Sequence, residues 1–360
     1  MIRWQMQKDI LQNRMKNLKN FQSVVSAVNL FRQIHIMNLM VTCIVNTAWT
    51  ITDILLIRKG KENGMKVLSL FDGISCGMVA LERANIKVDE YFASEIEPNA
   101  IKISKKNYPE IIQLGDITKI TEEMLDEIMP IDFVIGGSPC QDLSSTKADR
   151  ERKGLEGEKS NLYYHYLRIL NYCKPKYFLL ENVMMDKQWE DEISNDLGVL
   201  PIKINSNLVS AADRPRLYWT NIEGIEQPED KRILLKDIAI PTDEVPDKYF
   251  YNKPFIYHGD DKKIQCTLEI NTHNLLKGVY NLNNKCGTLT CVSGGYQEKK
   301  VFQNGRCRKL MPIEYERLQT LPDNYTEGIS DSKRYTTIGN GWTVDVIAHI
   351  LSYLPDEYKK

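Results

Sequence analysis

Short apolar runs alternate with segments of helical periodicity from residue 66 to residue 182. Apolar runs of four to eight residues suit buried strands, whereas apolar residues spaced three and four apart suit helices. Strands separated by helices predict an α/β fold with a doubly wound, mostly parallel sheet, which binds ligands at the carboxyl ends of its strands. The predicted strands are 66–71, 88–94, 111–114, 131–135 and 177–182, and the predicted helices are 77–86, 97–108, 121–129 and 161–173.

This alternation stops after the apolar run at 216–222. Residues 223–304 contain scattered Gly, Asn, Pro and Lys with short β-like runs such as 287–292, which predict a smaller, irregular or β-rich domain. Two later segments, 312–321 and 343–354, have helical spacing and are expected to pack back on the first sheet. The predicted division is 1–64, an N-terminal extension of uncertain role; 65–222, a first domain; 223–304, a second domain; and 305–360, a return to the first.

The N-terminal extension differs from the rest of the chain in charge. Residues 1–66 contain ten Lys and Arg against three Asp and Glu, so the remainder of this chain of net charge −1 carries −8. A nucleic-acid partner would therefore require positive charge concentrated locally. The first twenty residues are basic and polar, unlike a secretory signal. The uncharged run 36–52 is interrupted by Asn and Thr, and we expect a buried helix there rather than a membrane span.

Eight cysteines are scattered along the chain without any C-x-x-C pair. This spacing argues against a disulfide framework and against a zinc site, so we expect reduced thiols and no metal. The nearest approach to a cluster is Cys286, Cys291 and Cys307, which has no histidine close by in sequence.

The segment after the first predicted strand, "LFDGISCG" (70–77), is a candidate nucleoside-binding turn. It is not G-x-G-x-x-G, so a dinucleotide pyrophosphate fits it poorly. Glu95 ends the second strand, where an acid commonly accepts hydrogen bonds from ribose hydroxyls, and Asp116 ends the third, where it can accept the adenine amino group. Glycine turns and strand-end acids are common in α/β folds, but their combination favours a nucleoside cofactor.

The segment "GGSPCQDLS" (136–144) places Cys140 at the end of the fourth predicted strand, and Glu181 ends the fifth. Neighbouring strand ends would bring a thiol and a carboxyl group into one crevice. A core cysteine and a helix-capping pair are the alternative. Pro139 and Gln141 suit a rigid exposed turn, and an acid that ends an apolar strand is a candidate functional group.

Together these segments resemble the C5-cytosine-specific DNA methyltransferase family. "LFDGISCG", "GDIT", "GGSPCQDLS", "ENV", "DRPRLYW", "RKLMPIEYERLQTLPDNYT" and "GNGWTV" occur in the order of that family across residues 66–354. "SAADRPRLYW" and "TLTC" are more similar to the de novo-type enzymes than to many bacterial members. The resemblance implies a Rossmann-like methyltransferase domain and identifies the second domain, 223–304, as the target-recognition domain.

By this resemblance Cys140 is the nucleophile that adds to C6 of cytosine, which makes C5 nucleophilic. Glu181 contacts N3 and the exocyclic amine of the base, and Arg214 and Arg216 hold the base carbonyl and support the site. The R-x-R alternation is expected to place both arginines on one face of a strand. Two positions depart from the family pattern: Ala212 stands where many bacterial members have glutamine, and Gly341 where serine is common.

The same resemblance implies S-adenosyl-L-methionine as cofactor, S-adenosyl-L-homocysteine as its product, and no metal. It implies that the target base is flipped out of the helix and that 142–160 is a loop closing over it, with Lys147, Arg150, Arg152 and Lys153 near phosphates. The implied cofactor-binding residues are Phe71, Asp72, Gly73, Ile74, Glu95, Asp116, Ile117, Pro139, Asn340 and Trp342.

Three other functions compete with this interpretation. A tRNA-directed relative would carry a Cys-Phe-Thr signature, which is not seen in 223–304. A catalytically silent DNA-binding accessory protein is disfavoured by the intact site residues. An amino-group methyltransferase would carry an Asp/Asn-Pro-Pro-aromatic motif, which does not follow 131–135. We therefore expect a monomer acting on double-stranded DNA in the cytoplasm, at the nucleoid if bacterial or phage, without membrane contact and with a cognate restriction endonuclease as a candidate partner.

Overall fold

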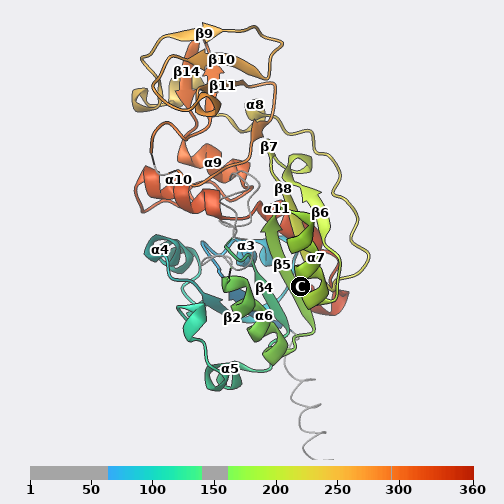
Figure 1. Ribbon diagram of the computed structural model, residues 1–360. Coiled ribbons are helices and arrows are strands. Elements are labelled where there is room, and N and C mark those ends of the chain that lie inside the picture. Colours follow the sequence, from blue (N-terminus) through green and yellow to red (C-terminus); the bar gives the residue numbers. More distant parts are fainter. Residues whose placement is uncertain (1–63, 140–160, 293) are drawn as a thin grey trace, which may run out of the picture. The chain divides into compact units, whose positions relative to one another are not determined.

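The computed structural model describes residues 64–139, 161–292 and 294–360. Its main element is a seven-stranded sheet with the order β3-β2-β1-β4-β5-β8-β6 (Figure 1). The strands are β1 (Met65–Leu70), β2 (Val88–Ser94), β3 (Ile112–Gln113), β4 (Phe133–Gly136), β5 (Tyr177–Val183), β6 (Ile202–Asn205) and β8 (Pro215–Thr220).

The sheet is mostly parallel, as predicted. Parallel pairing joins β1 to β2 and β4, β2 to β3, and β4 to β5, whereas β8 is antiparallel to both β5 and β6. The chain moves outward from β1 through β2 to β3 and then returns to place β4 on the other side of β1. This reversal makes the carboxyl ends of β1 and β4 a topological switch point, where ligands bind in open α/β sheets.

Helices cover both faces of the sheet. Successive residues of the central strands point to opposite faces, and the residues on both faces are apolar and buried. In β1, Val67 belongs to the apolar core on one face and Leu68 to the core on the other. The first core includes α3 (Cys76–Arg83), α4 (Pro98–Asn107) and α11 (Val344–Leu351); the second includes α5 (Glu122–Ile128), α6 (Leu162–Cys173) and α7 (Lys187–Leu197).

Local sequence signals explain several helix starts. Pro98 occupies the first turn of α4, where its missing N–H costs nothing, and the Glu97 side chain accepts a hydrogen bond from the Ala100 N–H at 2.7 Å. Thr121 caps α5 through the Met124 N–H. These signals lie close to the predicted boundaries.

A second sheet of five strands has the order β14-β13-β11-β10-β9. Its β14 pairs with β13 up to Lys309, so this sheet continues past the predicted domain boundary at residue 304. The strands are β9 (Phe255–Tyr257), β10 (Ile264–Leu268), β11 (Gly278–Asn281), β13 (Lys300–Gln303) and β14 (Arg306–Lys309).

Of the predicted β-like run 287–292, only Gly287 lies in a strand. β12 (Cys286–Gly287) pairs with β7 (Ala212–Asp213), and the following residues through Val292 are irregular. This pairing brings the segment after β12 next to the turn that carries Arg214.

The predicted C-terminal helices are present as α9 (Pro312–Leu318) and α11, and a further helix, α10 (Asp331–Asn340), lies between them. One other short α-helix is α8 (Leu235–Ile238). The 3₁₀ turns are η1 (Ile117–Lys119), η4 (Ser206–Leu208), η5 (Thr242–Glu244), η6 (Asp247–Tyr249), η7 (Asn274–Leu276) and η8 (Asp356–Tyr358).

Within the described ranges, no helix is long and apolar enough to cross a membrane. The predicted buried helix at 36–52 and the predicted closing loop at 142–160 lie outside the described residues.

Candidate active site

The predicted catalytic segment follows the end of β4, next to β5. The two strands pair in parallel register, with Gly136 opposite Leu180, so the residues after Gly136 leave the sheet beside Glu181. Cys140 and Gln141 lie outside the described residues. The half-buried Pro139 is the last described residue before them. The strand order therefore supports the expected proximity of the two segments.

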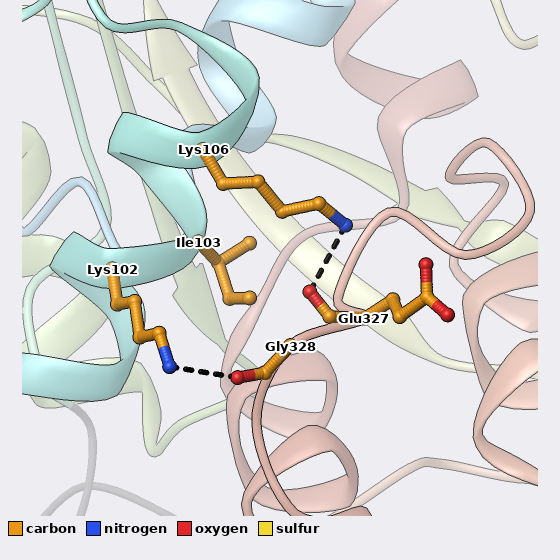
Figure 2. A pocket seen from close by; sticks show the side chains of 5 residues that line it. All are labelled: Lys102, Ile103, Lys106, Glu327 and Gly328. Carbon is orange, nitrogen blue, oxygen red and sulfur yellow. Dashed lines mark hydrogen bonds between the residues drawn. The ribbon is translucent and has the colours of Figure 1, made fainter.

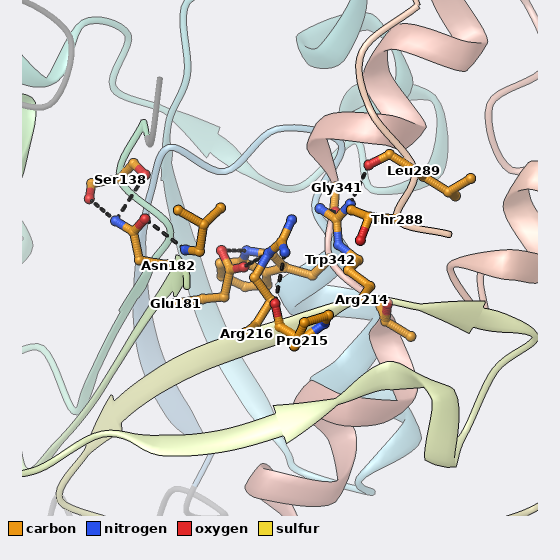
Figure 3. Close-up of polar contacts among 12 residues, drawn as sticks. Ser138, Glu181, Asn182, Arg214, Pro215, Arg216, Thr288, Leu289, Gly341 and Trp342 are labelled. Atoms are coloured by element: carbon orange, nitrogen blue, oxygen red, sulfur yellow. Dashed lines mark hydrogen bonds and ion pairs between the residues drawn. The ribbon is translucent and has the colours of Figure 1, made fainter. Parts of the chain in front are cut away.

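The carboxylate of Glu181 receives donors from two different elements. Its Oε1 pairs with Arg216 Nε of β8 at 2.9 Å, and its Oε2 accepts a hydrogen bond from Trp342 Nε1 at 3.0 Å (Figure 3). Glu181 is only 9 % exposed. A buried carboxylate is stable when paired and hydrogen-bonded, as this one is. The Trp342 contact was not anticipated from the sequence.

Arg214 and Arg216 have different surroundings. Arg214 lies between β7 and β8 rather than on one strand with Arg216, so the strand-alternation argument for a shared face does not apply. Its guanidinium is buried and donates to the backbone carbonyls of Leu289 (2.7 Å), Gly339 (3.3 Å) and Gly341 (3.1 Å). Arg216 meets Glu181 and also donates to the Pro215 carbonyl. Figure 3 shows the two guanidinium groups directed to these separate partners.

Asn182 links the two strand ends. Its Nδ2 donates to Ser138 Oγ at 3.0 Å, and its Oδ1 accepts from the Val183 N–H at 2.8 Å. Both Asn182 and Ser138 are buried. The bond fixes the backbone two residues before Cys140 against the strand that carries Glu181.

The turn after β1 is built around the buried Asp72. Its carboxylate accepts hydrogen bonds from Ser75 Oγ at 2.5 Å and from Tyr91 OH at 2.8 Å. Burial raises the pKa of Asp72 to about 6, although these hydrogen bonds favour the ionised form. Neither Ser75 nor Tyr91 was predicted. The position of Tyr91 on the inward face of a predicted strand was the only available signal for it.

Glu95, at the end of β2, is held by three backbone N–H groups. Its Oε2 accepts from Gly73 at 2.8 Å, and its Oε1 accepts from Ile96 and Glu97 at 2.7 and 2.8 Å. Each carboxylate oxygen has two lone pairs, so Oε2 can accept one more hydrogen bond, as a ribose hydroxyl would provide.

Asp116 and Ile117 lie beyond β3 at the start of η1. The Asp116 carboxylate accepts hydrogen bonds from the Thr118 backbone N–H (3.0 Å) and hydroxyl (2.8 Å), and the first of these is the main reason that the pKa of Asp116 is lowered. Ile117 is buried. A side chain added at Gly73 or at Gly115 would meet no described atom within 4 Å, so both turns border open space. These features fit an adenosine-bearing cofactor.

The other predicted cofactor residues have different surroundings. Phe71 is half-buried in the turn that follows β1, and Ile74 is buried with its carbonyl accepting Tyr325 OH at 2.6 Å. Asn340 is exposed, and its Oδ1 accepts a hydrogen bond from Cys291 Sγ at 2.6 Å. Tyr325 was missed because it follows an irregular segment with no periodic pattern.

A cavity of 410 Å³ lies between α4 and the segment Glu327–Gly328 (Figure 2). Its two cations are already engaged: Lys102 Nζ donates to the Gly328 carbonyl at 2.8 Å and Lys106 Nζ to the Glu327 carbonyl at 2.9 Å. The lysines therefore hold α4 to this segment, and the cavity is not part of the predicted site.

The comparison with protein families decides the identity. The family model described as C-5 cytosine-specific DNA methylase matches residues 65–195 and 225–355. The chain belongs to this family. It is accordingly a DNA (cytosine-5-)-methyltransferase, as the sequence motifs predicted.

Curated relatives agree with this assignment, and solved structures share the fold. The Type II methyltransferase M.HhaI of Haemophilus parahaemolyticus is 24 % identical over 82 % of this chain and 95 % of its own length. The Type II methyltransferase M1.ScrFI of Lactococcus lactis subsp. cremoris is 28 % identical over 82 % of this chain and 79 % of its own. The Entamoeba histolytica methyltransferase EhMeth has the same fold, with a TM-score of 0.65 at 19 % identity over 83 % of this chain and 100 % of its own.

Proposed function

We propose that this DNA methyltransferase methylates C5 of a flipped-out cytosine through a covalent bond between Cys140 and C6. The observation that supports the proposal is the register of β4 with β5, which brings Gly137, three residues before Cys140 in the sequence, beside the Glu181–Arg216 pair. A thiol nucleophile and a carboxylate are the groups that activation of a pyrimidine at C5 requires.

In the proposed reaction the Cys140 thiolate forms a bond to C6, and the electron pair of the C5–C6 double bond makes C5 nucleophilic. Glu181 accepts a hydrogen bond from the exocyclic amine, and its carboxyl group shares a proton with N3, which is itself an acceptor, as negative charge develops there. Arg216 uses two of its five N–H donors on Glu181 and Pro215, which leaves donors for the base carbonyl. Loss of the C5 proton and cleavage of the S–C6 bond then release the methylated base.

We assign Arg214 a supporting position in this reaction. Its three backbone carbonyl acceptors lie in the segment after β12 and at the C-terminal end of α10, so it fixes the backbone on both sides of the site. These three bonds hold the Arg214 side chain to the backbone, whereas the family resemblance implies that Arg214 contacts the base carbonyl.

S-adenosyl-L-methionine, when bound, supplies the methyl group and becomes S-adenosyl-L-homocysteine. Glu95 and Asp116 would hold its ribose hydroxyls and adenine amino group, and the Gly73 turn would leave space for it. Phe71, Ile74 and Ile117 would line its apolar surfaces. The pocket needs no metal ion for this role.

We further propose that residues 223–304 recognise the DNA sequence, that the substrate is double-stranded DNA, and that the enzyme acts as a cytoplasmic monomer. The naming of the relatives as Type II methyltransferases supports a cognate restriction endonuclease as a partner.

One experiment tests the substrate and the nucleophile together. The protein is incubated with labelled S-adenosyl-L-methionine and either DNA or tRNA, and labelled DNA is analysed by bisulfite sequencing. We expect label on DNA, at cytosine C5. We expect Cys140→Ala to abolish transfer, by more than a thousandfold, while cofactor binding is retained. Cys173→Ala, which alters a cysteine buried in α6, is the control and should retain activity.

Label on tRNA alone would overturn the choice of DNA as substrate. Turnover by the Cys140→Ala protein would show that the nucleophile is another residue.

A further inference from the structure

Trp342 joins the last predicted cofactor motif to the catalytic carboxyl group. Its indole Nε1 donates to Glu181 Oε2 at 3.0 Å across 161 residues of sequence, and both residues are 9 % exposed. The sequence placed Trp342 only as a wall of the cofactor pocket. The hydrogen bond gives it a direct connection to a group that is proposed to touch the base.

The two neighbours of Glu181 act on different oxygens. Trp342 bonds Oε2, and Arg216 Nε lies 2.9 Å from Oε1. An indole and a guanidinium are donors only, so both fix the carboxylate as an acceptor. Each oxygen retains a second lone pair for a substrate. The pair of donors thus sets the rotation of the carboxylate plane while leaving acceptor positions open.

Gly137 makes this approach possible. A Cβ atom at Gly137 would lie 2.8 Å from Trp342 Nε1 and 2.9 Å from Glu181 Oε2, closer than real side chains pack. The opposite side of the indole is near α3, because a Cβ at Gly77 would lie 3.6 Å from Trp342 Cζ3. The indole is therefore confined between Gly137, which follows β4, and Gly77 of α3, at the switch point of the sheet.

We propose that Trp342 is a positioning residue that orients Glu181 for addition of the Cys140 thiol to C6. The inference rests on the proposed function of Glu181, and it assigns to Trp342 the role of holding the Glu181 carboxylate in place. Arg216 alone would hold the carboxylate through one oxygen, and Trp342 adds a second point of attachment on the other. Misplacement of a reacting or stabilising group by about 1 Å costs on the order of a hundredfold in rate.

The test separates addition at C6 from methyl transfer. When the Cys140 sulfur bonds C6, C5 can take a proton from water; loss of the original C5 hydrogen and cleavage of the S–C6 bond then restore cytosine. Tritium release from DNA carrying [5-³H]cytosine therefore reports addition alone. It is measured without cofactor and with S-adenosyl-L-homocysteine, alongside kcat, KM and the cofactor Kd in full turnover.

For Trp342→Phe we expect tritium release and kcat to fall together by about ten- to a hundredfold, with the Kd of S-adenosyl-L-homocysteine changed by less than about threefold. Trp219→Phe is the matched control. Trp219 is a fully buried indole that donates to Ser194 Oγ at 2.9 Å, and its substitution removes the same kind of bond without touching Glu181. The control should retain its release rate.

A second replacement keeps the ring shape. Trp342→benzothienylalanine exchanges the indole N–H for sulfur, and it decides the question if Trp342→Phe does not fold. When Glu181 is already replaced by Gln, the additional exchange Trp342→benzothienylalanine should change tritium release by less than about twofold. The reason is that the effects of two residues that act as a unit are not additive.

Unchanged tritium release with a weakened cofactor Kd would overturn the proposal and leave Trp342 as a pocket wall. That result differs from failure of the proposed function, in which the unaltered protein would neither release tritium from DNA nor methylate it.

Discussion

At the scale of single residues, the site combines groups whose chemistry is set by burial. Asp72 is held in the turn after β1 by hydroxyl donors from Ser75 and Tyr91, yet burial raises its pKa to about 6. An acid with a raised pKa binds protons in the folded state at a pH where the unfolded chain does not. Ionised Asp72 therefore reduces the stability of the protein near neutral pH.

The sign of this effect can be measured. Between the ordinary pKa of 3.8 and the folded value of about 6, the folded state holds more protons, so its stability contribution from Asp72 increases as pH falls through 6 and is complete below 3.8. Relative to Asp72→Asn, the unaltered protein should gain about 2 kcal/mol in free energy of unfolding from pH 7 to pH 4. Urea unfolding across that pH range checks it.

Asp116→Asn supplies a control of opposite sign. Hydrogen bonds from Thr118 lower the pKa of Asp116, so the ionised group stabilises the fold above its ordinary pKa. This contribution should be lost as pH falls through the lowered pKa. A pH-independent difference between the unaltered protein and Asp72→Asn would contradict the assigned pKa.

At the scale of elements, a buried ion pair connects the second sheet to α9. Both Arg308 of β14 and Glu314 of α9 are fully buried, and the guanidinium donates to both carboxylate oxygens at 2.6 and 2.7 Å. The same carboxylate accepts the backbone N–H groups of Ile240 and Met311. One side chain thus orients a strand, a helix and a connecting segment.

Glu314→Ala should therefore lower the free energy of unfolding by about 3–5 kcal/mol, because it leaves the Arg308 charge buried without its partner. Replacing both residues, Arg308→Met with Glu314→Leu, should recover much of this loss. The exposed pair of Arg306 with Asp247 is the control, and Asp247→Ala should change stability by less than about 0.5 kcal/mol. Chemical denaturation measures all three, and an equal loss in the control would contradict the argument.

The predicted elements were found where local pattern was strong and missed where it was weak. The strand at 88–94 matches β2 in full, because Val88, Tyr91 and Phe92 are residues that favour strands. Helix α10 was not predicted, since its sequence DSKRYTTIGN has few apolar residues and two adjacent threonines. Of its buried residues, Tyr335 and Ile338 are largely apolar, but Thr337 and Gly339 are not, so the sequence lacks a continuous apolar stripe. The packing of this segment against the rest of the protein therefore decides that it is helical.

At the scale of the whole molecule, residues 64–360 form one compact unit that contains both sheets. All described site residues belong to this unit. The family match also begins at residue 65. These observations support the expectation that residues 1–64 are not required for catalysis.

A chain that starts at Met65 should consequently retain most of its methyltransferase activity on DNA and its midpoint of urea unfolding. Methyl transfer and tritium release, measured beside the full chain, check this. The truncated chain with Cys140→Ala is the inactive control. A folded but inactive truncated chain would show that residues 1–64 contribute to binding or catalysis.

The sequence by itself determined the family, the order of the strands and helices from β1 to β5, and the strand ends at which Glu181 and the acids of the cofactor turn occur. Apolar periodicity is a local property, and the motifs are short contiguous segments, so neither requires knowledge of distant contacts. Only the tertiary structure decided that Arg216 rather than Arg214 meets Glu181 and that Trp342 bonds the same carboxylate. These contacts join residues far apart in the chain, and their partners depend on strand pairing and side-chain packing.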